Sequence, residues 1–170
     1  TLVELNLSSH HISTSVAKIL AEGLQRNSSI KYISIGNSQF GDDAMIELCA
    51  CLGENCTIQT LDLERKGITG RSAPFLCTAI RESSSVTTVI LSNNELDQGL
   101  VDLSPCIEGL ESLEMHNCGM HHQNASEAMA KALTVATSLR SLELDRNTLD
   151  HTHAAVLSSG LKGCIALESL

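Results

Sequence analysis

The sequence predicts an α/β fold, a right-handed curved solenoid of β-α units with a parallel sheet on its concave face and helices on its convex face. Three observations support this prediction. A short aliphatic string recurs along the 170-residue chain, each copy alternates apolar and polar residues with period two, and the stretch after each copy has apolar residues at helical spacing. Hydrophobic residues make up 42% of the chain and aromatic residues only 2%, so the core must be aliphatic.

The recurring string has the form apolar-x-x-apolar-x-apolar. Six full copies begin at Leu2, Ile30, Ile58, Val86, Leu110 and Leu139, and a partial seventh begins at Leu167. Successive copies start 28, 28, 28, 24, 29 and 28 residues apart. We therefore expect residues 1–170 to form a single domain of six full repeats and part of a seventh.

Within each copy, the alternation predicts a short strand with one buried face, followed by a turn and a helix. The helical faces are predicted at Val16, Ile19, Leu20 and Leu24, at Met45, Leu48, Cys49 and Leu52, and at Ala125, Ala128, Met129, Ala132 and Leu133. The predicted N-caps are Ser13 or Thr14, Asp42, Ser72, Asn124, and Asp150 or Thr152. The 24-residue copy is four residues short, and we expect a truncated helix there.

The string LxxLxLxx(N/C)xL, repeated at 28 and 29 residues, resembles the ribonuclease-inhibitor-type leucine-rich repeats over essentially the whole chain. The resemblance implies that the ninth residue of each copy turns inward and bonds to backbone groups of the turn. Asn94, Cys118 and Asn147 match this pattern. His10, Ser38 and Lys66 depart from it, and we expect Lys66 to be excluded from the interior or to extend its amine outward.

Stacking of the repeats predicts a concave wall of strand side chains. Paired strands lie about 4.8 Å apart, whereas helices side by side need about 10 Å, so the array must curve with its sheet inside. Residues on this wall are the predicted partner-binding set: Tyr32, Asp62, Glu64, Arg65, Glu114, His116, Glu143, Asp145 and Arg146. We expect His116 to lie beside Asp145, which would favour the charged imidazole. The same polar residues are also typical of an ordinary solvated sheet face.

The charge balance bears on the kind of partner. Twenty Asp and Glu against 11 Lys and Arg give a net charge of −9. This charge repels a nucleic-acid backbone and an anionic membrane surface, so we expect neither as a partner and favour a protein with a basic segment. Seven cysteines, an odd number without a repeated CxxC, indicate a reducing, cytoplasmic setting.

Catalytic motifs are missing from the sequence. It contains no Gly-rich phosphate loop, no GxSxG and no HExxH, and Cys49, Cys77 and Cys118 fall at positions expected to be buried. We therefore expect no enzyme activity, no catalytic residues and no cofactor.

Histidines gather in the turns between strand and helix, and His122 and His151 occupy the same place in adjacent units. Stacked neighbours could share a metal ion. No cysteine or carboxylate recurs at that place, however, and the ligand spacing of a zinc site is absent, so we expect no metal site.

The leading interpretation is a non-catalytic module that binds a protein through the concave sheet face and the adjacent loops. The resemblance leaves an alternative open, a GTPase-regulating domain, because Ran GTPase-activating proteins share this repeat type. A purely structural or oligomerisation array is a third interpretation. Uncapped apolar edges at both ends of the array favour self-association.

Overall fold

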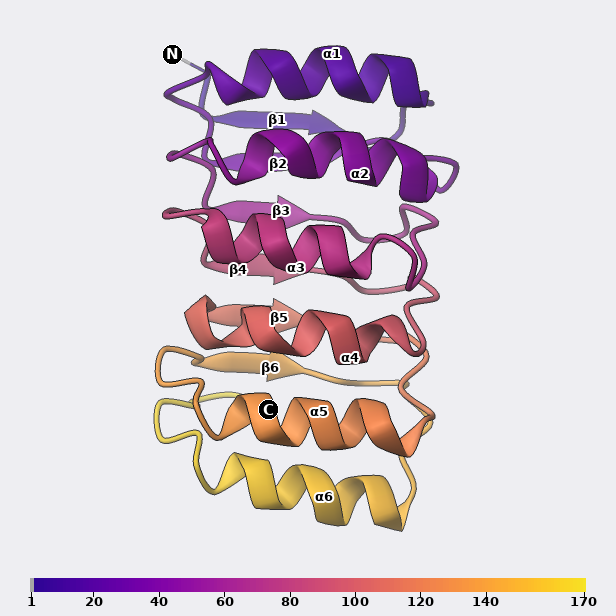
Figure 1. Cartoon of the computed structure of the whole chain (residues 1–170), viewed down its shortest axis with the longest axis vertical. Coiled ribbons are helices and arrows are strands. Elements are labelled where there is room, and N and C mark those ends of the chain that lie inside the picture. Colours follow the sequence, from indigo (N-terminus) through magenta and orange to yellow (C-terminus); the bar gives the residue numbers. More distant parts are fainter. Residues whose placement is uncertain (1) are drawn as a thin grey trace.

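A computed structural model describes residues 2–170, and Thr1 lies outside the described residues. Strands and helices alternate along the chain, as Figure 1 shows. The elements are β1 (Glu4–Leu7), α1 (Thr14–Gln25), β2 (Tyr32–Ile35), α2 (Gly41–Leu52), β3 (Thr60–Asp62), α3 (Ala73–Glu82), β4 (Thr88–Ile90), α4 (Gly99–Leu103), the 3-10 helix η1 (Ser104–Gly109), β5 (Ser112–Glu114), α5 (Gln123–Leu133), β6 (Ser141–Glu143) and α6 (His151–Leu161).

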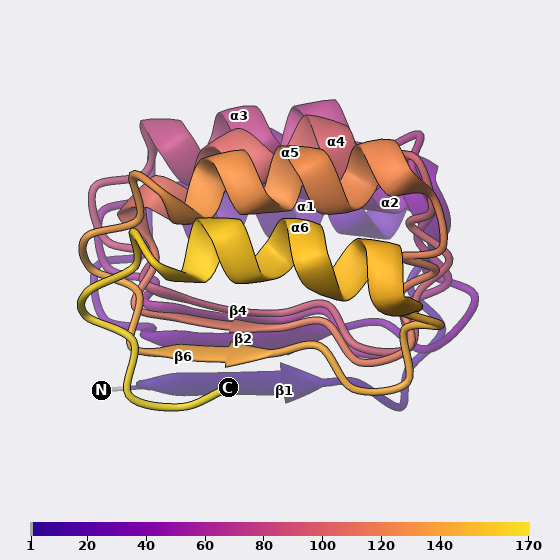
Figure 2. The same cartoon turned by 90° about the horizontal axis from the view of Figure 1, so that it is seen from below.

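The six strands form one sheet in chain order, and every neighbouring pair is parallel. The helices cover one face of this sheet and leave the other face uncovered (Figure 2). Equivalent residues of the repeats pair directly across the sheet: Leu5 with Ile33, Ile33 with Leu61, and so on to Leu142. The predicted right-handed curved β-α solenoid is confirmed.

The core lies between the sheet and the helices and is aliphatic, as the composition predicts. Each strand contributes its alternating apolar residues, and Leu61, Val89 and Leu142 are fully buried. Because parallel pairing keeps identical repeat positions in register, these side chains stack into continuous rows.

Buried polar side chains at the ninth repeat position hold the turns, as the resemblance implies. The Asn94 amide donates to the Leu63 and Leu91 carbonyls, each at 2.7 Å, and its oxygen accepts from the Lys66 amide at 3.0 Å. Asn147 repeats this arrangement two units further along the chain, and in the unit between them the Cys118 thiol donates to the Leu91 carbonyl at 3.2 Å. Each such side chain therefore satisfies buried backbone groups of two adjacent units.

The expectation for Lys66 was wrong. Its side chain is buried, with 2% of the residue exposed, and its ammonium donates to the Gly36 carbonyl at 2.9 Å and to the Ser34 hydroxyl at 3.1 Å. The long side chain extends to the preceding turn, where its ammonium donates to oxygen atoms. In other repeats, the Asn at this position donates to backbone oxygens in a similar way. Burial lowers the pKa of Lys66, an effect that the Asp62 and Glu64 carboxylates oppose.

The structure confirms two of the predicted helix N-caps. Ser13 caps α1, and Asp150 caps α6 by accepting from the backbone amides of Thr152 and His153. Ser72 occupies the N-cap position of α3 but makes no side-chain capping bond.

The predictions for Asp42 and Asn124 were wrong, because both side chains bond to a neighbouring unit and each lies inside its helix. The Asp42 carboxylate accepts from the backbone amide of Thr69 at 2.8 Å and from its hydroxyl at 2.7 Å. The Asn124 amide donates to Gln98 Oε1 at 2.9 Å.

The buried face of α1 also differs from the prediction. Val16 and Ile19 are exposed, Ile19 by 68%, whereas Ala17, Ala21 and Leu24 face the core. Within residues 2–170, α1 packs against α2 on one flank and has no helix on the other, so its outer apolar side chains stay uncovered. The predicted face of α2 (Met45, Leu48, Cys49 and Leu52) is buried, as are Ala125, Met129, Ala132 and Leu133 of α5.

The short repeat has the truncated helix that its length predicts. α4 has 5 residues and continues into η1, which carries Pro105 in its first turn. Its start packs tightly against the preceding unit: a Cβ built on Gly99 would lie 2.3 Å from the Cα of Gly70. Glycine is required here because two backbones approach each other directly.

All seven cysteines are free thiols, and every one except Cys56 is buried, including Cys49, Cys77 and Cys118. Burial raises the pKa of the Cys118 thiol to about 11. Across residues 2–170, no helix combines the length and the apolar character that crossing a bilayer requires.

Candidate protein-binding surface

The sheet face opposite the helices carries the residues that alternate with the core positions, and of these Ser34 is itself buried. The parallel register places the fifth residues of the repeats side by side across the six strands: Asn6, Ser34, Asp62, Ile90, Glu114 and Glu143. The third residues form a second row, Glu4, Tyr32, Thr60, Thr88, Ser112 and Ser141. This register follows from the equal spacing of the apolar string and puts the predicted side chains on one surface.

Five carboxylates gather on this surface and at the adjoining strand ends. We call Asp62, Glu64, Glu114, Glu143 and Asp145 the acidic strip. Ile90 lies in the same row between Asp62 and Glu114, and its side chain is half-buried. The strip therefore surrounds an apolar residue with negative charge.

Tyr32 and Asp62 are brought together by the pairing of β2 and β3. The Tyr32 hydroxyl donates to Asp62 Oδ2 at 2.7 Å. Burial, and then the hydrogen bond to the Asp62 carboxylate, raise the pKa of Tyr32 to about 12. The phenol thus stays protonated at neutral pH and holds one carboxylate of the strip in place.

Glu114 and Glu143 are directly paired on adjacent strands. Burial, and then repulsion from Glu143, raise the pKa of Glu114, whereas the nearby His116 opposes this rise. Two carboxylates in register are mutually destabilising, and a cation bound between them would relieve their repulsion.

His116 lies between two carboxylates of the strip. Its Nε2 is 2.8 Å from Glu143 Oε2, and its Nδ1 is 3.7 Å from Asp145 Oδ2. The predicted neighbour Asp145 does lie beside His116. Glu143 is closer, and the sequence did not predict this contact. A protonated imidazole would bridge the two carboxylates here.

Beyond the strand ends, a chain of contacts joins the turns. Glu64 Oε1 accepts from Asn93 Nδ2 at 3.0 Å, and Asn93 Oδ1 accepts from Asn117 Nδ2 at 3.2 Å. Arg65 Nε lies 3.5 Å from Glu64 Oε1. The two asparagines were missing from the predicted set, although their shared eighth position in adjacent repeats would have placed them beside the Glu64 turn.

The structure does not bring all the predicted residues together. Arg146 is exposed and, within the part of the chain that the structure describes, makes no ion pair. It lines a hollow of about 710 Å³ beyond β6 and α6, together with Leu144 and Leu170. Arg65, Asn93, Asn117 and Arg146 all occupy the eighth position with φ between 51° and 63°, where the chain turns away from the sheet.

Comparisons with known proteins agree with the repeat geometry. The chain is 29% identical to ribonuclease inhibitor from Mus musculus over 93% of its own length and 36% of that protein. It is 30% identical to NACHT, LRR and PYD domains-containing protein 9 from Bos taurus over 99% of its length and 17% of that protein. The chain is a leucine-rich repeat array of the ribonuclease-inhibitor type. No family model matches it.

Solved structures share the fold of the array. The leiomodin-1 actin-binding site 2 superposes on the array with a TM-score of 0.56 at 20% identity. The superposition covers 94% of the array and 81% of the leiomodin-1 chain. The C-terminal domain of tropomodulin from Caenorhabditis elegans gives a TM-score of 0.60 at 15% identity over 95% of the array and 83% of that chain.

Within residues 2–170, two groups of side chains could hold a metal ion. One lies in the acidic strip and consists of Glu114, His116 and Glu143; the other consists of Asp97, His121 and His122 in two turns. We expected no metal site because no carboxylate recurs at the place that His122 and His151 share, but a carboxylate, Asp97, does lie beside His121 and His122. Asp97 belongs to the preceding unit and holds the same twelfth position in its repeat as His121 does in the next, 24 residues later.

Proposed function

We propose that this array is a non-catalytic protein-binding module whose concave sheet face and adjacent loops hold a partner through the acidic strip. The observation that carries the proposal is the row of Asp62, Ile90, Glu114 and Glu143, which places carboxylates around an apolar residue on the uncovered sheet face. Protein interfaces typically combine an apolar centre with a polar rim.

The strip favours a partner with a basic segment. On this surface the five carboxylates outnumber the basic side chains near them, which are Arg65, 72% exposed, the His116 imidazole and the buried Lys66 ammonium. Burial, and then repulsion from Glu143, raise the pKa of Glu114, and a cation beside these two carboxylates would oppose that rise. An arginine or lysine side chain placed between Glu114 and Glu143 would supply that charge and form charge-assisted hydrogen bonds.

The names of the similar proteins support a protein ligand. One is an inhibitor of ribonuclease, and another is an actin-binding site. Both names describe recognition of a protein, which is the role that we propose for this array. The chain spans 36% of the mouse ribonuclease inhibitor. Our proposal therefore rests on the surface residues of this chain and not on what the whole relative binds.

We place the protein in the cytoplasm on the strength of its thiols. Seven free cysteines, including the exposed Cys56, suit a reducing compartment. Within residues 2–170, we find no contact that favours a GTPase-regulating domain or a purely structural array over protein binding through the acidic strip.

Selection of peptides from a displayed random library on the immobilised chain tests the proposal. We expect enrichment of peptides that contain lysine or arginine. Their affinity should fall at least about tenfold in the variant Asp62→Asn/Glu114→Gln/Glu143→Gln, because the opposite charges are lost. The same change in net charge on the convex side, Glu22→Gln/Glu82→Gln/Glu127→Gln, should leave the affinity within about twofold because these side chains lie on exposed helix faces.

The proposal would be contradicted by selected peptides that bind both variants equally well, since recognition would then lie elsewhere on the array. Enrichment of acidic peptides would contradict the proposed charge of the partner. Circular dichroism of both variants should show the unfolding transition of the parent chain, so that a loss of binding is not a loss of fold.

A further inference from the structure

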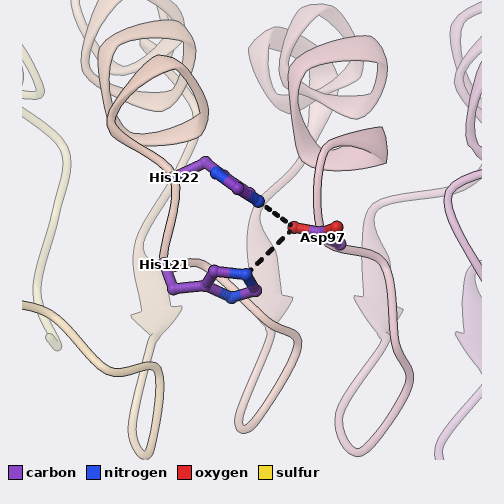
Figure 3. Close-up of side chains that lie close together, drawn as sticks. All are labelled: Asp97, His121 and His122. Carbon is purple, nitrogen blue, oxygen red and sulfur yellow. Dashed lines mark ion pairs between the residues drawn. The ribbon is translucent and has the colours of Figure 1, made fainter.

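Three potential metal ligands converge in two adjacent turns, away from the acidic strip. His122 Nε2 lies 3.0 Å from Asp97 Oδ1, and His121 Nε2 lies 3.4 Å from the same oxygen. Figure 3 shows both imidazoles turned toward the Asp97 carboxylate. Asp97 lies between β4 and α4, and the histidines lie between β5 and α5, so the cluster joins the short repeat to the next one.

The backbone holds the three side chains in this arrangement. The Asp97 amide donates to the Cys118 carbonyl at 3.1 Å, which ties the Asp97 turn to the turn that carries the histidines. The His121 amide donates to the Gly119 carbonyl at 2.8 Å. Asp97 has a φ of 47°, a conformation that suits Asp and Asn better than most residues. Main-chain hydrogen bonds therefore fix the two turns that carry the three ligand side chains.

The Asp97 carboxylate is only partly satisfied by the protein. Its Oδ1 atom is buried and has no hydrogen-bond donor within the described residues, although two ring nitrogens lie close to it. The two imidazole contacts therefore lack the alignment of hydrogen bonds. A buried carboxylate oxygen without a donor is destabilising, and a cation bound there would remove that cost.

The surroundings attract positive charge. Asp97 lines a polar depression of about 510 Å³, together with Glu95 and Asp102. None of the described residues that line this depression is Lys or Arg. The depression beside the cluster therefore carries three carboxylates, Glu95, Asp97 and Asp102, and its negative charge favours the approach of a cation.

We propose that Asp97, His121 and His122 form a binding site for a divalent transition-metal ion of the zinc class. The three potential ligand atoms all lie within 4.8 Å of one another. Two imidazole nitrogens and one carboxylate oxygen are a ligand set that Zn²⁺ uses, with a fourth tetrahedral position left for water. Mixed nitrogen and oxygen donors disfavour Ca²⁺ and Mg²⁺, which prefer oxygen ligands.

The other cluster on the array is a weaker candidate. Glu114, His116 and Glu143 offer one imidazole, and that imidazole already contacts Glu143 at 2.8 Å and Asp145 at 3.7 Å. It also belongs to the proposed protein-binding surface. The Asp97 cluster shares no residue with the acidic strip, so the two proposals can fail independently.

Titration with Co²⁺ and then Zn²⁺ tests the site. A background variant, Cys56→Ser, removes the exposed thiol as a competing ligand. In this background we expect one Co²⁺ per chain, visible as ligand-field absorption that Zn²⁺ abolishes, and a rise in the thermal unfolding midpoint with added Zn²⁺. Asp97→Asn and His121→Gln/His122→Gln should each weaken Zn²⁺ binding at least about tenfold and remove the rise in midpoint.

Matched controls separate this site from adventitious binding. His10→Gln/His11→Gln removes another adjacent histidine pair, and His116→Gln removes the imidazole of the acidic strip. Both should retain Zn²⁺ binding within about twofold of the background. The Asp97→Asn variant keeps the size of the side chain and tolerates a positive φ, so it should fold as the parent does in the absence of metal.

The proposal is overturned by any of three results. One is the absence of saturable binding in the Cys56→Ser chain. A second is binding that survives in Asp97→Asn or in His121→Gln/His122→Gln at the affinity of the background. Loss of binding in His116→Gln alone would assign the ion to the acidic strip and would also overturn this site.

Discussion

At the scale of single residues, buried polar side chains at the ninth repeat position join one turn to the next. The Asn94 side chain forms hydrogen bonds with backbone carbonyls and amides of two units, and the Lys66 ammonium donates hydrogen bonds to oxygens of the preceding unit. The turns of this array therefore depend on a few buried donors whose loss leaves backbone groups without partners.

Asn94→Ala should destabilise the chain by about 2–4 kcal/mol, because two buried carbonyls and the buried Lys66 amide each lose a hydrogen bond. Urea unfolding followed by circular dichroism measures this change. Gln59→Ala, at an exposed position, serves as the control and should shift the free energy of unfolding by less than about 0.5 kcal/mol. Equal stability of Asn94→Ala and the parent chain would show that these turns hold without the amide.

We expect the buried thiols to make the fold sensitive to alkali. Burial raises the pKa of Cys49 and of Cys51 to about 12, and that of Cys118 to about 11, from 9.0. Above pH 9 the folded state keeps protons that the unfolded chain releases, so the free energy of unfolding falls as the pH rises. Burial also raises the pKa of Cys164, whereas it lowers the pKa of Lys66, which has the opposite effect on the pH dependence.

We expect the slope of stability against pH to be negative between pH 9 and 11, by about 1–4 kcal/mol per pH unit. Urea midpoints measured under reducing conditions at several alkaline pH values test this. Cys49→Ala/Cys118→Ala should flatten the slope, even though the variant is less stable at neutral pH. A slope that is unchanged in this variant would assign the alkaline sensitivity to other groups.

Some of these residue roles could be predicted from the sequence, and others depend on neighbours that the sequence does not reveal. The inward positions of Asn94, Cys118 and Asn147 follow from the repeat pattern. The burial of Lys66 does not, because it requires oxygens of Ser34 and Gly36 in the preceding unit to face the amine. Within the predicted surface, the rows of carboxylates were expected from the register, but the contact between His116 and Glu143 depends on side-chain orientation.

At the scale of elements, the helices pack closely enough that some positions tolerate only glycine. Gly160 in α6 lies against α5, where a Cβ would approach the Ala130 carbonyl oxygen at 2.3 Å. Gly23 in α1 is exposed, and a Cβ there would have no heavy atom within 4 Å. Two glycines within helices thus differ only in what surrounds them.

The same substitution should therefore have opposite effects at these two sites. Gly160→Ala should destabilise the chain by about 1–3 kcal/mol, because the methyl group forces α5 and α6 apart. Gly23→Ala should stabilise it by about 0.5–1 kcal/mol, because alanine is the better helix former. Thermal unfolding of the two variants beside the parent measures both shifts, and a change of the same sign in both would refute the packing argument.

At this scale the sequence pattern predicts the strand register but not every helix cap or every buried helix face. Equal spacing predicts the strand register because a slip of one residue would expose the aliphatic face. The pattern failed at Asp42 and Asn124, whose side chains bond Thr69 and Gln98 of neighbouring units. It also failed at Ile19, since an amphipathic face is buried only where another helix covers it.

At the scale of the whole molecule, the stacked units leave two kinds of surface uncovered. The concave sheet face carries the acidic strip, and the ends of the stack carry apolar side chains. Leu2 lies at one end, and Ile165 and Leu170, 86% and 69% exposed, lie at the other. Exposed apolar surface of this kind favours association.

We expect the 170-residue chain to self-associate end to end as its concentration rises. Sedimentation velocity over a range of concentrations measures this. Ile165→Glu/Leu170→Glu should shift the chain toward monomer, because burying the new charges would be unfavourable. Phe75→Glu, at a 49% exposed position on the convex side, is the control and should leave association unchanged. A parent chain that stays monomeric throughout would refute the expectation.

Hydrogen exchange of backbone amides, measured with and without a selected lysine- and arginine-containing peptide, tests the protein-binding role most directly. If the acidic strip holds the partner, protection should increase in β3, β5 and β6 and in the turns that follow them, and α1 to α3 should exchange at unchanged rates. Protection confined to the helices, with the strands and turns of the concave side unaffected, would contradict the account.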